Sequence, residues 1–425
     1  MFATGEATAQ ADLVSAPPEG FRPLFDGSTL ANWHGQPELS PRDAAAADDQ
    51  TRTKWAEDAA KHWSVSNGEV VNDGQGPYLT TDETFRDFEL LIQYNAAPGA
   101  DSGLYLRGVP QVQIWDAFDD AAVDKTGVGS GGLFNNADDA PGRNPSVKAD
   151  RRSGEWNQFR IRLIGERCWV WLNGQEVVRD ARMANYFDRE EPLPLEGPIQ
   201  LQTHGGKMRW RNAFIHPLAA EEANATLRQA DLAGEQIDYL FNGLSLPQWD
   251  GATSNYEAVL RCKDGEGGVL FSRTEYEDFK TFIEFRLPPG GNNGLVVRYP
   301  TESGGKSDGA YAAMTELQIL DDGHAKYGSL DPRQAHGSAY GMAAAKRGYL
   351  RPTGEWNYQK VIVRGSTIEV ELNGTVILET DLSQIDDYMA GKEHPGKDRT
   401  RGAVGLAGHT DPVEFRLVAV QPIAD

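Results

Sequence analysis

Two short segments place polar side chains at alternate positions: QVQIWD, which begins at Gln111, and ELQILD, which begins at Glu316. Because successive strand residues face opposite sides, Glu316 shares a face with Gln318, and Gln111 shares one with Gln113 and Trp115. A carboxylate and amides on one face are suited to proton transfer and hydrogen bonding, and the indole could stack on a sugar ring. A solvated outer face is the alternative, but the repetition favours a site.

Arginine precedes each segment by a few residues, and histidine follows it at a fixed distance. By strand alternation, Arg107 and Arg298 lie on the same sheet face as the polar side chains of the two segments. We therefore expect both arginines to bind substrate. His204 and His409 are 205 residues apart, the same offset that separates the two polar segments. An imidazole titrates near neutral pH and is the natural general base or acid. The alternative is a histidine that only caps a glycine turn.

An aspartate ends each polar segment. Alternation puts Asp116 and Asp321 on the opposite face unless the strand bulges. Five strand residues span roughly 16 Å, whereas a glycosidase needs its two carboxyl groups about 5–9.5 Å apart. Glu316 and Asp321 are therefore a poor acid/nucleophile pair, and Gln111 cannot transfer a proton at all.

Long loops follow the two segments, at 117–153 and 322–353. Matching long loops in a sandwich usually build a site. The second loop carries His324, His336 and Tyr340, whereas the first has no histidine.

Acidic pairs in the first loop raise the question of a metal. Asp119-Asp120 and Asp138-Asp139 could hold Ca²⁺ or another divalent cation through loop oxygens, although such runs are more often solvated. A catalytic zinc site is not indicated, because the chain has no HExxH or CxxC motif.

The chain repeats itself along its whole length. LFDGSTLANW at 24–33 returns as LFNGLSLPQW at 240–249, SGLYLRG at 102–108 as NGLVVRY at 293–299, and GEWN at 154–157 recurs at 354–357. A period of about 200 residues is too long for a solenoid and indicates a duplicated domain. The expected parts are a tail at 1–18, a first domain at 19–218, a connector at 219–235 and a second domain at 236–425.

Strand signals dominate both copies. Asn173-Gly174 and Asn373-Gly374 each separate two apolar runs, which is the strongest short-range hairpin signal. Many short strands with turns between them predict an all-β antiparallel sandwich in each copy. Helix is expected in an insertion of the first copy, at about 43–62, and in the connector.

Composition and net charge limit the classes of binding partner and the cellular compartment that we expect for this chain. The formal net charge of -22 disfavours nucleic acid and anionic membranes, whereas a neutral sugar carries no such penalty. The two cysteines cannot form a disulfide framework, and no apolar run is long enough to span a bilayer. The polar start lacks the features of a signal peptide, so the chain is either cytoplasmic or a mature extracytoplasmic form; its small, proline-containing residues favour a periplasmic or secreted protein.

The ordered motifs resemble one known family. LF(D/N)G, SGLYLRG, QVQIWD, GEWN, LNG, GPIQLQTHG and MRWRN together are similar to the 3-keto-disaccharide hydrolase domain family, in two tandem copies. The resemblance implies two concanavalin A-like β-jelly rolls. It also implies a bacterial carbohydrate-active enzyme in which a C3 ketone acidifies the C2 proton, a base removes that proton, and elimination followed by hydration gives net hydrolysis.

The resemblance assigns roles residue by residue. Its implied catalytic residues are Glu316, Asp321, His336 and His409, with His409 or Glu316 as base. Its implied substrate-binding residues are Arg298, Gln318 and Tyr340 in the second copy and Arg107, Gln113, Trp115, Asp116 and His204 in the first. Gln111 puts the acid/base competence of the first copy in doubt. A non-catalytic carbohydrate-binding protein and a laminarinase-like glycoside hydrolase are the alternatives.

Overall fold

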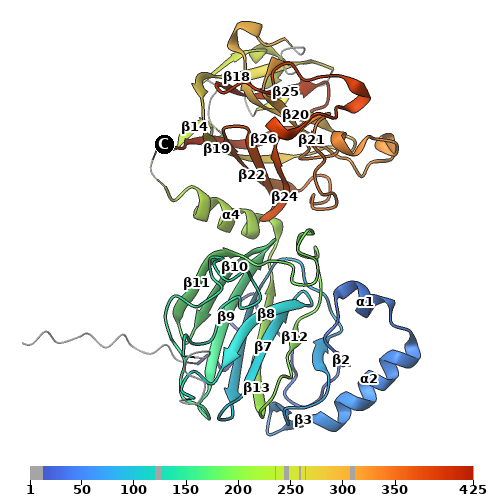
Figure 1. Cartoon of the computed structure of the whole chain (residues 1–425), viewed down its shortest axis with the longest axis vertical. Coiled ribbons are helices and arrows are strands. Elements are labelled where there is room, and N and C mark those ends of the chain that lie inside the picture. The colour runs from blue at the N-terminus through green and yellow to red at the C-terminus, as the bar shows by residue number, and fades with distance from the viewer. Residues whose placement is uncertain are drawn as a thin grey trace, which may run out of the picture. The chain divides into compact units, whose positions relative to one another are not determined.

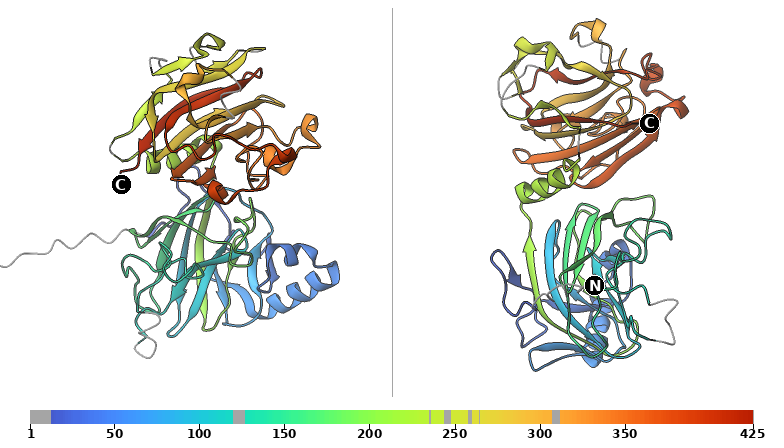
Figure 2. Two further views of the ribbon diagram at one scale, coloured as in Figure 1. Left: turned by 45° about the horizontal axis from the view of Figure 1, so that its top comes forward. Right: turned by 90° about the vertical axis from the view of Figure 1, so that its left-hand side faces the viewer.

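The chain divides into two compact units, Met1–Ala219 and Ala220–Asp425, each a sandwich of two antiparallel sheets (Figures 1 and 2). The computed structural model describes residues 13–119, 127–234, 236–243, 248–257, 260–263, 265–306 and 312–424. The all-β fold class expected from the repeat is thereby confirmed. Within the described residues, no helix has the length and apolar character to cross a bilayer.

The first unit pairs an eight-stranded sheet, in the order β11-β10-β9-β6-β13-β4-β3 with β1 beside β13, with a five-stranded sheet in the order β2-β5-β12-β7-β8. Its strands are β1 (Arg22–Pro23), β2 (Trp33–Gln36), β3 (Trp63–Ser66), β4 (Glu69–Asn72), β5 (Tyr78–Thr81), β6 (Phe88–Ala96), β7 (Asp101–Leu106), β8 (Val109–Trp115), β9 (Asn157–Ile164), β10 (Arg167–Leu172), β11 (Gln175–Arg182), β12 (Gln200–Leu201) and β13 (Met208–Pro217).

The second unit repeats this plan, with an eight-stranded sheet in the order β16-β17-β26-β19-β22-β23-β24, β14 beside β26, and a five-stranded sheet in the order β15-β18-β25-β20-β21. Its strands are β14 (Asp238–Phe241), β15 (Trp249–Gly251), β16 (Tyr256–Glu257), β17 (Arg261–Cys262), β18 (Gly267–Tyr276), β19 (Phe279–Arg286), β20 (Asn292–Tyr299), β21 (Thr315–Leu320), β22 (Trp356–Arg364), β23 (Thr367–Leu372), β24 (Thr375–Asp381), β25 (Gly402–His409) and β26 (Glu414–Pro422). Short 3-10 turns lie at Thr253–Asn255, Thr301–Ser303, Ala325–Tyr327, Pro332–Gln334, Leu382–Gln384 and Met389–Gly391.

The core of each unit lies between its two sheets and is built by period-two alternation. Val112 and Ile114 of β8 belong to the first core, and Leu317 and Ile319 of β21 belong to the second, all fully buried. The polar residues between them therefore lie on the outer face of each five-stranded sheet. The two units carry different polar residues on this outer face.

Helices α1 (Pro41–Ala46) and α2 (Asp49–His62) form the insertion of the first unit. Ser40 caps the N-terminus of α1, because its hydroxyl accepts from the backbone N of Asp43. Asp48 caps α2 in the same way by accepting from the backbone N of Thr51. Helix α2 packs so closely on β2 that a Cβ at Gly35 would lie 2.5 Å from Ala59 Cβ. The insertion is thus fixed against the edge strand of the five-stranded sheet.

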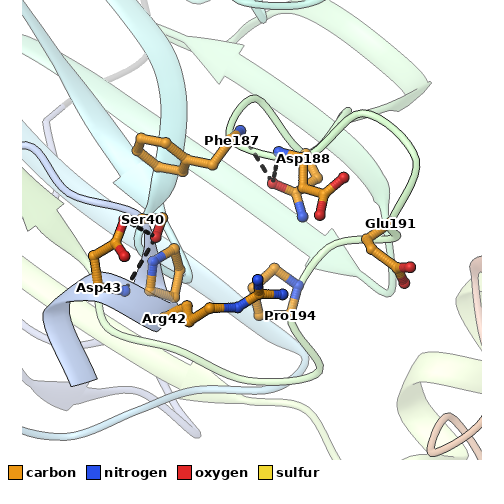
Figure 3. A pocket seen from close by; sticks show the side chains of 9 residues that line it. Ser40, Arg42, Asp43, Phe187, Asp188, Glu191 and Pro194 are labelled. Carbon is orange, nitrogen blue, oxygen red and sulfur yellow. Dashed lines mark hydrogen bonds between the residues drawn. The ribbon is translucent and has the colours of Figure 1, made fainter. Parts of the chain in front are cut away.

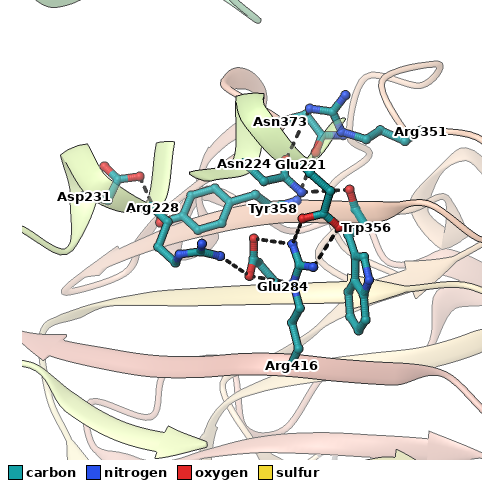
Figure 4. Close-up of polar contacts among 10 residues, drawn as sticks. All are labelled: Glu221, Asn224, Arg228, Asp231, Glu284, Arg351, Trp356, Tyr358, Asn373 and Arg416. Carbon is teal, nitrogen blue, oxygen red and sulfur yellow. Dashed lines mark hydrogen bonds and ion pairs between the residues drawn. The ribbon is translucent and has the colours of Figure 1, made fainter. Parts of the chain in front are cut away.

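Helix α4 (Ala220–Asp231), which the sequence places in the connector, packs on the eight-stranded sheet of the second unit (Figure 4). The buried carboxylate of Glu284 receives Arg228 at 2.7 Å and Arg416 at 2.9 Å. Arg416 also donates to Glu221 of the helix at 2.8 Å. The helix is therefore held to its sheet by a network centred on one buried carboxylate.

The first unit uses the corresponding position differently. Gln93 stands where the repeat places Glu284, and its amide donates to the backbone O of Val14 at 2.6 Å while Arg211 donates to its oxygen at 2.9 Å. In both units, then, the segment that precedes the sandwich contacts the eight-stranded sheet at the same position, Gln93 in the first unit and Glu284 in the second. Only the second unit uses a buried charge for this contact.

We expect Glu284→Gln to loosen α4 and to lower the free energy of unfolding of the second unit by about 2 kcal/mol, because two arginines lose a carboxylate that is only 1% exposed. Hydrogen exchange should show faster exchange of the α4 amides. The amides of the first unit serve as the internal control, and unchanged protection of α4 would contradict the role of this network.

Candidate active site

A histidine and a carboxylate meet on the outer face of the second five-stranded sheet. Glu316 on edge strand β21 faces Val296 of β20, and His409 ends β25 on the other side of β20. His409 Nε2 lies 3.0 Å from Glu316 Oε1, within hydrogen-bond distance. The side chain of Glu316 crosses over Gly294, where a Cβ would lie only 2.1 Å from Oε1. The sequence singled out Glu316 and His409 separately; the structure brings them together, and Gly294 makes room for their contact.

The pair is half-open to solvent, because the side chain of Glu316 is 11% exposed and that of His409 is 39% exposed. Burial lowers the pKa of His409, but the hydrogen bond and charge of Glu316, with the charge of Asp411, outweigh it and raise this pKa above 6.5. With Nε2–H held by Glu316, the Nδ1 atom of the neutral ring is left as a base.

A second histidine lies near Glu316. His394 comes from the loop after β24 and is 5% exposed. Burial lowers its pKa from 6.5 to about 4, against the charge of Glu316. Burial therefore keeps the His394 imidazole neutral although the charge of Glu316 favours its protonation. The sequence reasoning missed it, since His394 has no counterpart in the other copy and no motif around it.

The loop after β21 returns along the open edge of that strand. The backbone N of Tyr340 donates to Glu316 O at 2.9 Å, and that of Gln318 donates to Ser338 O at 3.1 Å. Ala339 is fully buried in the core, so alternation directs Tyr340 to the face of Glu316. The hydroxyl of Tyr340 accepts from Gln334 at 2.9 Å. Tyr340 therefore adjoins Glu316 through its backbone, and its role in substrate binding stays a prediction.

Gln318 contacts a neighbour on the same face rather than pointing freely outward. Its amide donates to Asn292 Oδ1 at 2.6 Å. In the first unit the amide of Gln113 donates to Asp101 Oδ1 at 2.8 Å, so the same contact is made twice.

The first unit also brings its polar residues together. Gln111 donates to Gln113 on the outer face, and His204 Nδ1 lies 3.2 Å from Asp101 Oδ2. Asp101 was not singled out from the sequence. Its only signal is that it stands where the second copy has Asn292, one residue before SGLYLRG.

The first unit carries a further polar cluster on this face. The hydroxyls of Tyr105 and Tyr78 donate to Glu38 at 3.0 and 3.2 Å. Burial, with the charge of Glu38, raises the pKa of both phenols, so they remain hydrogen donors. The second unit has Val296 at the position of Tyr105. Its outer face has a small apolar cluster there.

The prediction that Arg107 and Arg298 bind substrate is wrong. Both side chains are 1% exposed and both residues have φ above +50°. Arg298 lies at a register shift within β20 and Arg107 lies in the turn after β7, so neither follows the alternation of a regular strand. Arg298 donates to Asp278 at 3.0 Å and to the backbone O of Glu277 at 2.9 Å. Arg107 donates to Asp87 at 3.1 Å. These arginines are structural.

The catalytic role of Asp321 and the binding role of Asp116 are not supported either. Asp321 accepts from the backbone N of Gly290 at 2.8 Å, and Asp116 accepts from that of Gly99 at 2.9 Å. Both anchor the turn before the preceding strand. As alternation predicted, Asp321 does not share the face of Glu316, so no glycosidase pair forms between them.

The catalytic role of His336 is excluded by its position between the sheets. It is 2% exposed, its Nδ1 accepts from the backbone N of Leu320 at 3.2 Å, and its Nε2 lies 3.1 Å from Gln359 Oε1. Burial lowers its pKa to about 3. His324 caps a 3-10 turn by accepting from Lys326 N at 3.2 Å.

Trp115 cannot present its ring to a sugar in this structure. It is 5% exposed and packs edge-on against Phe134 with ring centroids 5.0 Å apart. The loop after β8 covers it, since the backbone N of Trp115 donates to Ser130 Oγ at 3.0 Å. Trp115 is therefore a packing residue.

The calcium hypothesis finds no cluster to support it. Among the described residues, no group of three or more His, Cys, Asp or Glu side chains is arranged to hold a metal ion. Asp138 instead pairs with Arg143 at 2.9 Å, and Asp120 lies outside the described residues.

A separate pocket of about 350 Å³ opens in the first unit beside α1 (Figure 3). Phe187 and Arg42 contribute to its lining. Arg107, just beyond the end of β7, donates to the backbone O of Pro194 in the same lining, whereas Asp101 begins β7. Six strand residues rise about 20 Å, so this pocket lies far along the strand from His204.

Comparison with known proteins gives a consistent family. Residues 20–216 and 237–421 each match the model of the 3-keto-alpha-glucoside-1,2-lyase-like domain. A 3-keto-disaccharide hydrolase of Bacteroides thetaiotaomicron is 29% identical over 185 residues, which cover 38% of this chain and 63% of that protein. The chain thus matches less than two thirds of that relative.

Solved structures with some likeness include two putative glycosyl hydrolases of Parabacteroides distasonis. One is 25% identical, with a TM-score of 0.38, covering 44% of this chain and 100% of that one. The other is 19% identical, with a TM-score of 0.40, covering 46% and 97%.

Removing the buried guanidinium should affect folding rather than substrate affinity. We expect Arg298→Ala to lower the free energy of unfolding by about 3 kcal/mol, because Asp278 and several carbonyls lose their donor. Arg273→Ala is the matched control: its ion pair with Asp250 is exposed and should cost less than about 1 kcal/mol. Denaturant titration measures both, and equal effects would refute the structural role.

The contact with Glu316 should be visible in the titration of His409. We expect its pKa, measured by NMR, to lie above 6.5 and to fall in Glu316→Gln, where burial remains but the carboxylate is gone. A raised folded-state pKa means that protonated His409 stabilises the fold, and this stabilisation is lost as pH rises through that pKa. The His409→Ala spectrum assigns the resonance, and an unchanged pKa in Glu316→Gln would contradict the pairing.

Proposed function

Because the chain belongs to the 3-keto-alpha-glucoside-1,2-lyase-like domain family through both of its units, we propose that it cleaves 3-keto-glycosides by proton abstraction and elimination. The observation that carries the proposal is the contact of 3.0 Å between His409 and Glu316 on an outer sheet face. This arrangement supplies one base, half-open to solvent and oriented by one carboxylate.

The chemistry needs no second carboxylate. A ketone at C3 of the sugar acidifies the proton on C2. His409 Nδ1, or Glu316 itself, takes that proton, and the C–H electron pair forms an enolate. The C1–O bond then breaks with its electron pair going to the aglycone oxygen, which takes up a proton. Addition of water to the resulting double bond gives net hydrolysis.

Arg298 cannot stabilise the enolate, since its guanidinium is buried and donates to Asp278 and to backbone carbonyls. Two groups are the candidates: Tyr340, whose backbone N donates to the backbone O of Glu316, and the imidazolium that forms on His409 when it takes the proton. A donor already aimed at a developing oxyanion lowers the barrier most effectively. Tyr340 is therefore the residue proposed to stabilise the enolate.

Direct glycosidase chemistry is not favoured by the geometry. Asp321 holds a backbone turn, so the pair of carboxylates that such a mechanism needs is not formed by Glu316 and Asp321. A non-catalytic sugar-binding protein remains the competing function, and turnover separates the two.

We expect the full chain to consume a 3-keto-glucoside but not the unoxidised parent glucoside, because only the ketone acidifies C2. Deuterium at C2 should slow the reaction severalfold if proton abstraction limits the rate. His324→Ala, which alters a turn-capping histidine away from Glu316, is the control and should keep full activity. Equal cleavage of the parent, or sugar binding with no turnover of either compound, would rule the proposal out.

A further inference from the structure

We propose that the first unit carries a catalytic pair of its own, His204 with Asp101, acting on the same class of 3-keto-glycoside. This inference rests on the function proposed above and extends it to a unit whose Gln111 cannot transfer a proton. The pair was hidden in the sequence because its carboxylate comes from a different strand.

The two units exchange a carboxylate and an amide between two positions. Gln111 occupies the place of Glu316, and Asp101 occupies the place of Asn292. Asp101 and Asn292 are also equivalent in the structure. Asp101 accepts from the side-chain amide of Gln113 at 2.8 Å, and Asn292 accepts from that of Gln318 at 2.6 Å. Each unit thus keeps one carboxylate next to its histidine.

The backbone explains how His204 reaches Asp101. Strand β12 ends at Leu201, and Gly205 and Gly206 turn the chain with φ of +124° and +75°. A Cβ on Gly206 would lie 2.7 Å from Ala100 Cα, so only glycine allows this close approach. The backbone N of Asp101 donates to Gly205 O at 3.1 Å, which fixes the turn beside the carboxylate.

His409 is held in another way, within β25 and paired with Gly267. The histidines therefore face their carboxylates with different ring nitrogens, Nδ1 in His204 and Nε2 in His409. The nitrogen left as a base is Nε2 in the first unit and Nδ1 in the second. The side chain of His204 is also the more exposed of the two, at 57% against 39%.

The reaction step is the same in both units. His204 Nε2 takes the C2 proton, the C–H pair forms the enolate, and the C1–O pair leaves with the aglycone oxygen, which is protonated. Asp101 orients the ring and stabilises the imidazolium, as a carboxylate does for histidine in other general-base pairs. Water then adds to the double bond.

The test compares single and double variants of the full chain on one 3-keto-glucoside. We expect Glu316→Gln to retain at least a tenth of the wild-type turnover, and Asp101→Asn combined with Glu316→Gln to fall at least tenfold below that. Adding Gln111→Glu to the double variant gives the first unit the carboxylate arrangement of the second and should restore turnover. Melting temperatures within a few degrees of the wild type exclude unfolding as the cause.

The outcomes separate the two proposals. A wild-type chain with no turnover defeats the proposed function, and this inference with it. An active wild type whose Glu316→Gln variant is inactive defeats only the inference, as does an Asp101→Asn/Glu316→Gln chain as active as Glu316→Gln alone. Loss in the double variant with rescue by Gln111→Glu supports it.

Discussion

Each sandwich is closed at one end by a buried arginine that links its two sheets. Arg107, in the turn after β7, and Arg298, at a bulge within β20, both have positive φ and reach Asp87 and Asp278. Each aspartate also accepts from the glycine N of a hairpin turn in the other sheet, at 3.0 and 2.9 Å. Uncompensated burial of a guanidinium would be costly, so this corner and the strand register that leads to it are tightly constrained.

That constraint determines what the outer face can carry. Upstream of the bulge the strands keep strict alternation, so Gly294 lies under Glu316 and β25 brings His409 alongside. At the bulge itself, alternation would put Arg298 on the outer face, but its side chain turns inward to Asp278 instead. The sequence motif that seemed to combine a binding arginine with a polar strand therefore combines two separate tasks, one structural and one chemical.

The sequence predicted the duplication and the all-β class, because these follow from repeat spacing and from the turn and strand signals. It singled out Glu316 and His409 separately but did not predict that the two side chains meet. It failed where the backbone departs from a regular strand. The positive φ of Arg298 reversed its direction. The loop after β21 buried His336, and in the first unit the loop after β8 covered Trp115. His394 and Asp101 were missed because a single position, taken alone, does not reveal which strand's side chain it will contact.

The two copies show why a site should be compared as a set of contacts rather than position by position. Read singly, Gln111 marks the loss of an acid and Asp101 is an ordinary polar residue. Considered together, they show that the carboxylate, which the second unit carries on its edge strand, lies on β7 rather than on the edge strand β8 in the first unit. His204 still has a carboxylate, that of Asp101, at 3.2 Å. A carboxylate that only orients an imidazole can approach it from either strand, because the requirement is the distance to one ring nitrogen. The strand that carries the carboxylate also determines which imidazole nitrogen can act as the base, Nε2 in His204 and Nδ1 in His409.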